Sequence, residues 1–138
     1  CMEKIHVKVD WCDKNYGAVT ECEALNGVVA VTNKTYDGLM ADLGDAVRFH
    51  VEGCVADGDE MPEWLVSGDY AFDIELGTSA LLRKCEQFTS LAAIARASGI
   101  SQQQLSHYAN GLRSPRPEQR RRIVEGIHRI GKECLEVV

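Results

Sequence analysis

Apolar and polar residues alternate along the first part of the chain, as they do in half-buried β-strands. Lys4–Trp11 reads KIHVKVDW, in which every second residue is apolar, and this predicts a strand with one buried face. Asp13-Lys14-Asn15 is typical of a turn, so we expect Tyr16–Glu23 to pair with the first strand as a hairpin. A further turn at Leu25-Asn26-Gly27 precedes a third strand at Val28–Thr32, which is rich in β-branched residues.

The apolar positions change to helical spacing after Thr35. They recur every three or four residues as far as Cys54, which predicts an amphipathic helix that Thr35 caps and that runs to about Asp57. Three glycines inside it each cost roughly 1 kcal/mol relative to alanine, so tertiary packing must hold the helix together. Gly58 ends it, and Tyr70–Leu76 alternates again as a fourth strand. The predicted element order is therefore β-β-β-α-β.

The rest of the chain has helical patterns only. Thr78–Phe88 predicts a short helix with four inward residues, Leu81, Leu82, Cys85 and Phe88. The helix after Pro117 carries an apolar stripe of heptad type, formed by Ile123, Ile127, Ile130, Cys134 and Val137. Packing inside the domain and pairing with a second copy explain this stripe equally well. We expect an α+β chain, with a β-rich domain at 2–76 and an all-α domain at 77–138.

Within the helical part, Ser90–Pro117 has the spacing of a helix-turn-helix. Ala95 lies four residues before Gly99, where two helices must cross closely, and Gly99 supplies the positive φ of the turn. Ser101 followed by Gln104 predicts a capping box at the start of the second helix. The apolar faces that join the two helices come from Ile94, Ile100, Leu105 and Tyr108.

The second helix, Gln102–Asn110, is the predicted recognition helix, which would enter the major groove of DNA. Glutamine can pair bidentately with adenine, so the polar residues of this helix are candidates for base readout: Gln102, Gln103, Gln104, Ser106 and His107. A second set is expected to contact phosphates, namely Ser101, Asn110, Arg113 and Arg116. The alternative is an αα-hairpin whose glutamines are only solvated surface.

Over about thirty residues this segment resembles the DNA-binding domains of the phage-repressor (lambda/Xre) type. The resemblance implies operator double-stranded DNA as a partner, and a homodimer or higher homo-oligomer, because two half-sites supply affinity and palindromic specificity. One position departs from the pattern, since Leu91 stands where a glutamine often opens the first helix. Arg120, Arg121 and Arg122 begin the last helix and either meet phosphate or form a charged helix surface.

The net charge of −6 divides into two opposite halves. Residues 1–75 carry 5 Lys and Arg against 16 Asp and Glu, a net charge of −11, whereas residues 76–138 carry 10 against 5, a net charge of +5. A basic unit can bind a polyanion, and an acidic one is repelled by it. Acidic surfaces are common in soluble proteins, but a reversal of sign at this point favours two units with different partners.

Four short motifs in the acidic half resemble those of the HicB antitoxins. Asn15-Tyr16-Gly17 matches the hairpin region of that family, Leu25-Asn26-Gly27 its turn, and Asn33-Lys34-Thr35 the start of its helix. Met61-Pro62 matches the pair that follows the helix.

Two positions depart from the HicB pattern: Asn26 replaces the usual proline, and Gly38 replaces the glutamate common three residues after the threonine. The resemblance implies a partial RNase H-like fold in the first domain. It also implies an antitoxin that binds over the active site of a small, mRNA-cleaving HicA-like toxin, while the second domain represses the operon. The toxin-binding residues are not identified by the resemblance.

Groups able to perform catalysis are scattered along the chain. The strand carboxylates Asp10, Glu21, Glu23 and Asp73 could hold metal ions in an RNase H-like fold, but alternation directs Asp10 to solvent, so solvated strand faces are the better explanation. No ligand or nucleophile spacing relates the histidines, which are His6, His50, His107 and His128. We therefore expect no enzyme, no cofactor and no metal. A free-standing transcriptional regulator with a small-molecule-sensing first domain, and a nuclease, are the alternatives.

The six cysteines are scattered without C-x-x-C spacing, which favours free thiols in a reducing cytoplasm over zinc or a disulfide framework. No run of about 18 apolar residues predicts a membrane span, and no signal peptide is recognised. We interpret Met2 as the natural start, with Cys1 as an addition before it.

Overall fold

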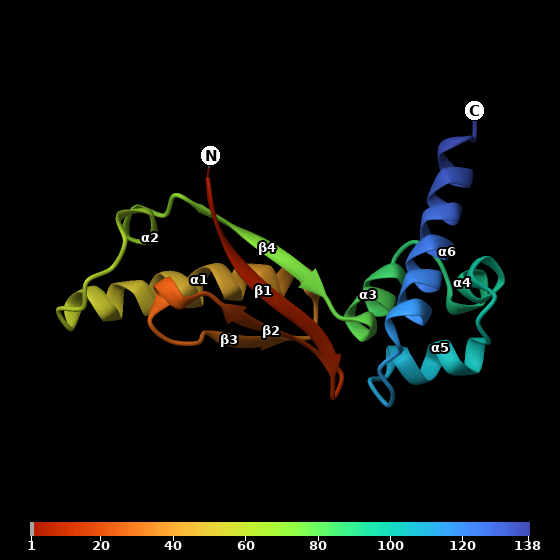
Figure 1. Ribbon diagram of the computed structural model, residues 1–138, viewed down its shortest axis with the longest axis horizontal. Helices are drawn as coiled ribbons and strands as arrows, with labels where there is room; N and C mark the ends of the chain where they lie inside the picture. The colour runs from red at the N-terminus through yellow and green to blue at the C-terminus, as the bar shows by residue number, and fades with distance from the viewer. Residues whose placement is uncertain (1) are drawn as a thin grey trace. The chain divides into compact units, whose positions relative to one another are not determined.

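The computed structural model describes residues 2–138, which divide into two compact units, one ending at Gly77 and the other beginning at Thr78 (Figure 1). The first unit contains a four-stranded sheet, and the second is helical. This confirms the predicted α+β class. The predicted domain boundary, between residues 76 and 77, lies one residue before the division between the units.

Four strands form the sheet of the first unit in the order β3-β2-β1-β4. They are β1 (Glu3–Cys12), β2 (Asn15–Glu21), β3 (Ala30–Asn33) and β4 (Tyr70–Leu76). The pairs β1–β2 and β2–β3 are antiparallel, whereas β4 runs parallel to β1. A parallel neighbour requires a crossover connection, and the 21-residue helix α1 (Tyr36–Ala56) lies in that connection.

The core of the first unit lies between α1 and one face of the sheet. On β1, Ile5, Val7 and Val9 are fully buried, and the polar residues between them point to the opposite, open face. Four residues of α1 are buried at helical spacing, namely Leu39, Leu43, Val47 and Val51. Burial of each such side chain stabilises the fold by roughly 1.5–3 kcal/mol. The strand alternation and the helical stripe in the sequence therefore belong to the same apolar layer.

The turn between β1 and β2 is tighter than predicted. Asp13 and Lys14 both have positive φ, 51° and 65°, as in the two-residue turns that match the twist of a hairpin. Asn15 therefore already belongs to β2, opposite Cys12.

The predicted second and third strands were placed incorrectly at their adjoining ends. β2 ends at Glu21, and Glu23–Leu25 is a short 3₁₀-helix, η1, instead of the end of a strand. Asn26 follows in a left-handed conformation with φ of 54°, which turns the chain. The strand β3 then begins at Ala30, two residues later than predicted, and Val28 is 71% exposed before it.

The start of α1 explains why Gly38 occupies its position. Thr35 caps the helix as predicted, since its hydroxyl accepts from the backbone N–H of Gly38 at 3.0 Å. The Asn33 amide accepts from the N–H of Thr35 and donates to the Asp42 carboxylate at 2.9 Å. A Cβ at position 38 would lie only 2.6 Å from the Asn33 oxygen. A side chain at position 38 therefore conflicts with the Asn33 network.

A short helix between α1 and β4 was not predicted. It is α2 (Glu63–Ser67), which begins after Pro62 and ends at Gly68, whose φ is 80°. Five residues are too few to show a helical period in a sequence, and only Leu65 among them is buried.

The second unit consists of α3 (Thr78–Cys85), α4 (Leu91–Ser98), α5 (Gln102–Ala109) and α6 (Pro117–Leu135). Their shared core includes Leu82, Ile94, Ile100, Leu105, Tyr108 and Ile123. The prediction that Phe88 ends the first of these helices and points inward was wrong. The helix stops at Cys85, and Phe88 is 66% exposed in the segment that follows. Among the described residues, no helix is both long and apolar enough to cross a membrane.

Candidate nucleic-acid interface

The connection between α4 and α5 has the local geometry that the sequence predicts. Gly99 adopts φ of 75° after the last turn of α4, and its N–H donates to the carbonyl of Ala95 at 2.9 Å. Ile100 is buried in the turn, where it anchors the connection to the core. Ser101 then begins α5, because its hydroxyl accepts from the N–H of Gln104 at 3.2 Å.

Only half of the predicted capping box is formed. The side-chain amide of Gln104 donates to the hydroxyl of Tyr108 at 2.8 Å, one turn further along α5, instead of reaching back to Ser101. Tyr108 is a core residue with 4% exposure, and its hydroxyl would otherwise lose a partner on burial. Gln104 therefore joins the surface of α5 to the core.

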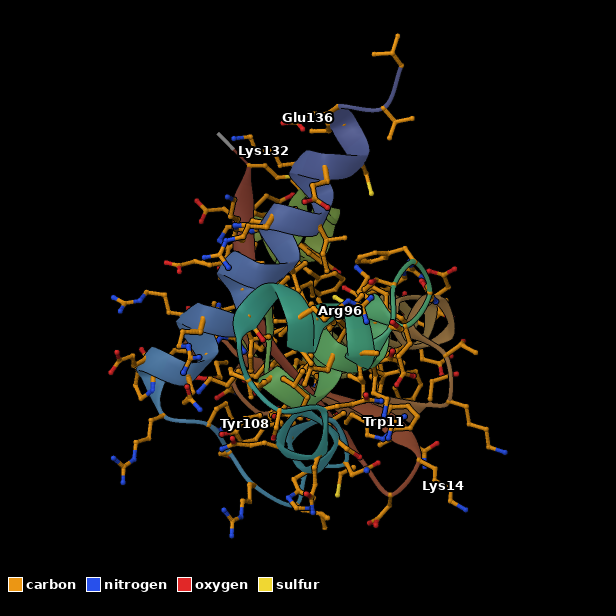
Figure 2. All side chains as sticks on the ribbon, turned by 90° about the vertical axis from the view of Figure 1, so that its right-hand side faces the viewer. Trp11, Lys14, Arg96, Tyr108, Lys132 and Glu136 are labelled. Carbon is orange, nitrogen blue, oxygen red and sulfur yellow. The ribbon has the colours of Figure 1, made fainter. Side chains whose placement is uncertain are left out.

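The other candidates for base readout differ in exposure. Gln102 and Gln103, in the first turn of α5, are exposed, whereas Ser106 and His107 are half-buried. Figure 2 shows the side chains of this unit, with Arg96 of α4 and Tyr108 of α5 labelled. The exposed glutamines have the side chains most available to a ligand of this helix.

Asn110 caps the end of α5 and bonds within the protein. Its side-chain oxygen accepts from the guanidinium of Arg83, and its amide donates to Ser106 at 3.4 Å. Arg83 also donates to the carbonyl of Ala109 at 3.3 Å, so a cation from α3 meets the negative end of the α5 dipole. Sequence reasoning missed Arg83, and its place in the last turn of α3 was the available signal.

Arg113 and Arg116, the predicted phosphate contacts, are both exposed in the loop between α5 and α6. Arg116 directly precedes Pro117, which occupies the first turn of α6. The exposed Arg96 on α4 adds a further positive charge that the predicted site did not include. Long, exposed cationic side chains of this kind can reach the phosphates of a nucleic acid.

The basic triplet that opens α6 serves mainly inside the domain. Arg122 donates to the carbonyls of Ser98 and Gly99 at 3.2 and 3.1 Å, which satisfies orphan acceptors at the end of α4. Arg120 donates to the hydroxyl of Thr78 at 2.9 Å. Arg121 is exposed and lies 4.0 Å from the carboxylate of Glu125. The sequence left open whether this triplet contacts phosphate or forms a charged helix surface. Arg120 and Arg122 bond instead to groups of the protein itself.

A close approach of α6 to α4 also holds the site together. A Cβ on Gly126 would lie 3.0 Å from both the backbone nitrogen and the Cβ of Ser98. The sequence prediction placed the close crossing at Ala95, which does pack against the shared core. Gly126 was missed, because its close neighbour lies 28 residues away in the chain.

The spacing of α4, the turn and α5 corresponds to a known family. Residues 80–126 match the family described as "Helix-turn-helix". Residues 80–126 are a helix-turn-helix domain of the lambda repressor/Xre-like type. The chain is accordingly a DNA-binding transcription regulator, which confirms that part of the sequence prediction. No curated protein and no solved structure matches the chain.

The structure of this domain also explains why Leu91 stands where a glutamine often opens the first helix. Leu91 packs against the domain core, together with Leu81 and Ile127. An apolar residue therefore replaces the glutamine at a position where α4 needs burial.

Three carboxylates of the sheet unit lie beside His6 and Lys8 of β1 on the open face. His6 lies 3.1 Å from Asp73 and 3.4 Å from Glu75 of the neighbouring strand, and Lys8 lies 3.4 Å from Glu21. The hydrogen bond to Asp73, followed by that to Glu75, raises the pKa of the His6 imidazole above its ordinary value. Within residues 2–138, no three His, Cys, Asp or Glu side chains are grouped so that they could hold a metal ion.

Two further candidates of the sheet unit, Asp10 and His50, lie in different surroundings. Asp10, exposed on β1, lies against Gly77. His50 contacts the carbonyl of Leu25 through Nε2 at 2.7 Å and is half-buried, which agrees with its interpretation as a satisfied residue. The thiols of the described cysteines are free: Cys12, Cys22, Cys54, Cys85 and Cys134.

Proposed function

We propose that this chain is an antitoxin of the HicA/HicB type that represses its own operon. Its helix-turn-helix domain binds operator DNA, and its acidic sheet unit binds and neutralises an mRNA-cleaving, HicA-like toxin. The proposal assigns no catalytic step and no cofactor to either unit.

In the proposed DNA complex, the first turn of α5 reads base edges through Gln102 and Gln103. Ser106 and His107, one turn further along α5, are half-buried and contact bases where the DNA lies close to the helix. Gln104 and Asn110 hold the helix in place through Tyr108 and Arg83. Arg113 and Arg116, with Ser101 at the helix start, contact phosphates and fix the register without reading sequence.

The charge of the sheet unit is the observation that carries the antitoxin proposal. This unit has a net charge of −11, and one face of its sheet is open to solvent. A toxin that holds RNA must present a basic surface, to which an acidic domain is electrostatically complementary. Such a field speeds capture of the toxin and repels RNA from the same surface. The β-β-β-α-β order and the HicB-like motifs support this assignment.

Co-purification tests the proposal directly. The full chain is co-expressed with the tagged product of the neighbouring short, basic reading frame. We expect the two proteins to co-purify, with weaker association at high salt, and we expect the chain to suppress cleavage of RNA by its partner. A neighbour that neither binds the chain nor cleaves RNA contradicts the antitoxin role and leaves the DNA-binding regulator.

A free-standing regulator that senses a small molecule is the second candidate. A groove of about 450 Å³ runs between the edge of the sheet and α1, lined by residues that include Val28, Phe49, His50 and Cys54. Mixed apolar and polar linings of this volume can hold small ligands. This candidate predicts that operator affinity changes on addition of a metabolite fraction, whereas the antitoxin predicts a response to the basic protein.

A further inference from the structure

The strand β3 forms one edge of the sheet, and among the described residues no strand lies on its outer side. The N–H of Thr20 donates to the carbonyl of Val29 at 3.0 Å, and the N–H of Val29 donates to the Thr20 hydroxyl at 2.9 Å. Both backbone groups of Val29 therefore point toward β2. Since this direction alternates along an antiparallel pair, the N–H and C=O groups of Ala30 and Thr32 point away from β2.

This edge lacks the features that usually prevent a further strand from pairing. Natural edge strands are commonly protected by charged side chains or by proline. The opposite edge strand, β4, carries Asp73 and Glu75. By contrast, Val28–Thr32 reads VVAVT and contains neither a charged residue nor a proline. The outer edge of β3 is therefore open to strand addition, in which main-chain hydrogen bonds supply affinity.

The groove between β3 and α1, of about 450 Å³, lies along the same edge. Its lining includes Phe49, which is 78% exposed, and Val28, which is 71% exposed. A strand paired with β3 would lie about 4.8 Å beyond it, with alternate side chains directed to the helix side. Ala46 and Gly53 also line the groove, and a Cβ on Gly53 would meet nothing within 4 Å. The groove thus has both room and apolar contacts for such side chains.

The charges around the groove favour a positively charged occupant. Asp57 is part of the lining, and Asp42 accepts from the Asn33 amide at the other end of β3. Burial, and then the carboxylates of Asp59 and Asp57, raise the pKa of the Cys54 thiol, which also lines the groove. No lysine or arginine is among the described residues of the lining. A cation brought into the groove therefore meets carboxylates and no like charge.

We propose that β3 and this groove bind an extended segment of a basic protein, which adds a strand to the sheet. The bound segment pairs its backbone with Ala30 and Thr32, places apolar side chains beside Phe49 and directs positive charges toward Asp57. A row of backbone groups beside an apolar groove fits a strand better than a small molecule, which can use only one or two of them. The inference rests on the proposed function and deepens it, because the basic toxin supplies this segment.

Amide exchange of the full chain with synthetic peptides tests the proposal. The probe is a peptide that alternates lysine and valine over about six residues, a usual strand length. We expect it to bind and to slow exchange of the Ala30 and Thr32 amides roughly tenfold or more, as nuclear magnetic resonance measures. The amides of Val31 and Asn33 point toward β2 and are internal controls. A peptide that alternates glutamate and valine should bind weakly.

Two substitutions test the backbone edge and the apolar groove separately. Thr32→Pro removes an outward N–H, a change that edge strands tolerate, and should lower peptide affinity roughly tenfold or more. Phe49→Ala removes the exposed ring from the groove and should also lower the affinity roughly tenfold. Circular dichroism checks the fold of both variants. Phe49 is exposed, so Phe49→Ala keeps the test valid if Thr32→Pro does not fold.

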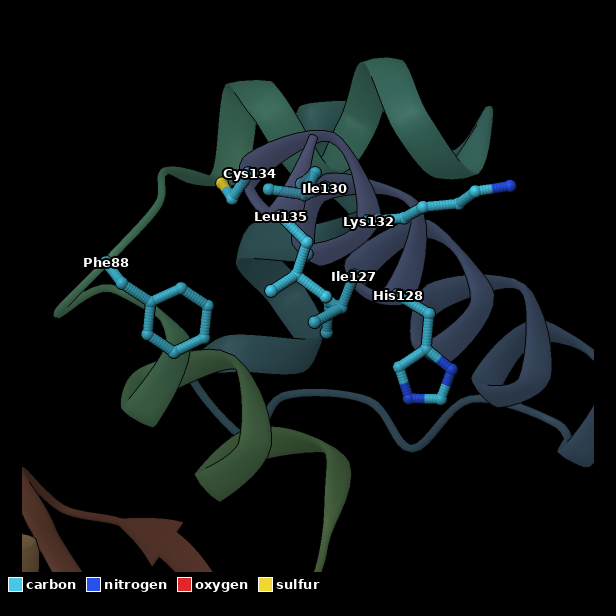
Figure 3. A pocket seen from close by; sticks show the side chains of 8 residues that line it. Phe88, Ile127, His128, Ile130, Lys132, Cys134 and Leu135 are labelled. Carbon is cyan, nitrogen blue, oxygen red and sulfur yellow. The ribbon is translucent and has the colours of Figure 1, made fainter. Parts of the chain in front are cut away.

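An apolar groove of the helical unit provides the matched control. Figure 3 shows this groove, of about 670 Å³, between Phe88 and the apolar side chains of α6. Phe88 is 66% exposed, and the groove is lined by Lys132 and has no strand in its walls. Phe88→Ala should therefore leave binding of the lysine–valine peptide unchanged. Equal losses in Phe88→Ala and Phe49→Ala would overturn the proposal, since the peptide would then bind any exposed apolar surface.

A chain that binds neither peptide overturns the proposal, as does binding that leaves the exchange of Ala30 and Thr32 unchanged. Protection of these amides that grows with the concentration of the free chain also overturns it, because a second copy then occupies the edge. Co-purification separates this result from the antitoxin role. A basic neighbour that still binds the Thr32→Pro and Phe49→Ala variants refutes only the strand addition. Peptide binding without binding of the neighbour refutes only the antitoxin.

Discussion

The polar side chains of α5 divide into two groups with different tasks. Gln102 and Gln103 are exposed in its first turn, while Gln104 and Asn110 bond to Tyr108 and Arg83. All four side chains end in an amide, so only the direction in which each one points from α5 separates the exposed pair from the bonded pair. Substitutions in the two groups should therefore affect DNA binding in different ways.

Replacing Gln103 with alanine removes a predicted base contact. We expect Gln103→Ala to weaken binding to the operator by roughly 1–3 kcal/mol and to change binding to random duplex little. Fluorescence anisotropy with both duplexes measures the difference. Gln104→Ala is the matched control and should lower the melting temperature and weaken both duplexes together. An equal loss on both duplexes for Gln103→Ala would show that this residue does not read bases.

Removing Arg113 or Arg116 should weaken binding to every sequence. Each change takes away a phosphate contact, so the slope of log affinity against log salt should decrease by about 1 per residue. A salt titration of operator binding measures this slope. Arg48→Ala removes the same charge from an exposed side chain of the sheet unit and serves as the control. A slope that Arg113→Ala and Arg116→Ala leave unchanged refutes the phosphate assignment.

The helices of the DNA-binding unit are held at their ends by arginines from other helices. Arg122 and Arg129 donate to carbonyls in and after the last turn of α4, and Arg83 does the same for α5. Both helices are only eight residues long, and helices this short are marginal without tertiary contacts. These end contacts and close packing, more than helix propensity, keep α4 and α5 in place.

The crossing of α4 and α6 depends on the missing side chain of Gly126. Gly126→Ala puts a methyl group 3.0 Å from the backbone of Ser98, so the helices must shift, and we expect a loss of about 1–3 kcal/mol in unfolding free energy. Denaturant unfolding measures it. Gly44→Ala in α1 is the control, since its methyl group meets nothing, and it should stabilise by about 0.5–1 kcal/mol. Equal effects of the two changes would disprove the tight crossing.

The parallel pairing of β1 and β4 includes an ion pair that depends on pH. Carboxylates of Asp73 and Glu75 raise the pKa of His6 in the folded chain. Its protonated form therefore stabilises the sheet below the unfolded-state pKa of about 6.5, and the effect is lost as pH rises through the folded-state pKa. His6→Gln should lower the melting temperature more at pH 6 than at pH 8. His128→Gln is the control, and an equal loss at both pH values contradicts the pairing.

The chain as a whole consists of two units of opposite charge with separate cores. The sheet unit buries Leu43 of α1 between helix and sheet, and the helical unit buries Leu105 of α5 in its own core. Units of this kind generally fold on their own cores. One chain can then bind DNA through the helical unit and, in the proposed function, a basic protein through the sheet unit.

Separate cores predict separate unfolding. Leu43→Ala should destabilise the sheet unit by roughly 2–5 kcal/mol and leave operator binding intact, because its cavity lies in the other unit. Calorimetry and anisotropy on the same variant measure both effects. Leu105→Ala is the reciprocal variant, and it should abolish operator binding. Loss of operator binding in Leu43→Ala would show that the two units fold together.

Local patterns determined much of this protein from the sequence alone. The alternation in β1, the helical stripe of α1 and the Gly99 turn each depend on neighbours within a few residues, so their elements were predicted in the right order. The predictions were wrong in short segments. Glu23 lies in a 3₁₀-helix instead of a strand, and Phe88 lies beyond the end of α3. Such short segments contain too few positions to show a period.

Only the tertiary structure decided which polar residues are available to a partner. Gln104, Asn110 and Arg122 resemble their exposed neighbours in the sequence, yet each bonds to a group from the core or from another helix. Gly126 is likewise explained only by Ser98, 28 residues away. Contacts between residues distant in the chain depend on how helices cross, and no local pattern of side chains encodes that geometry by itself.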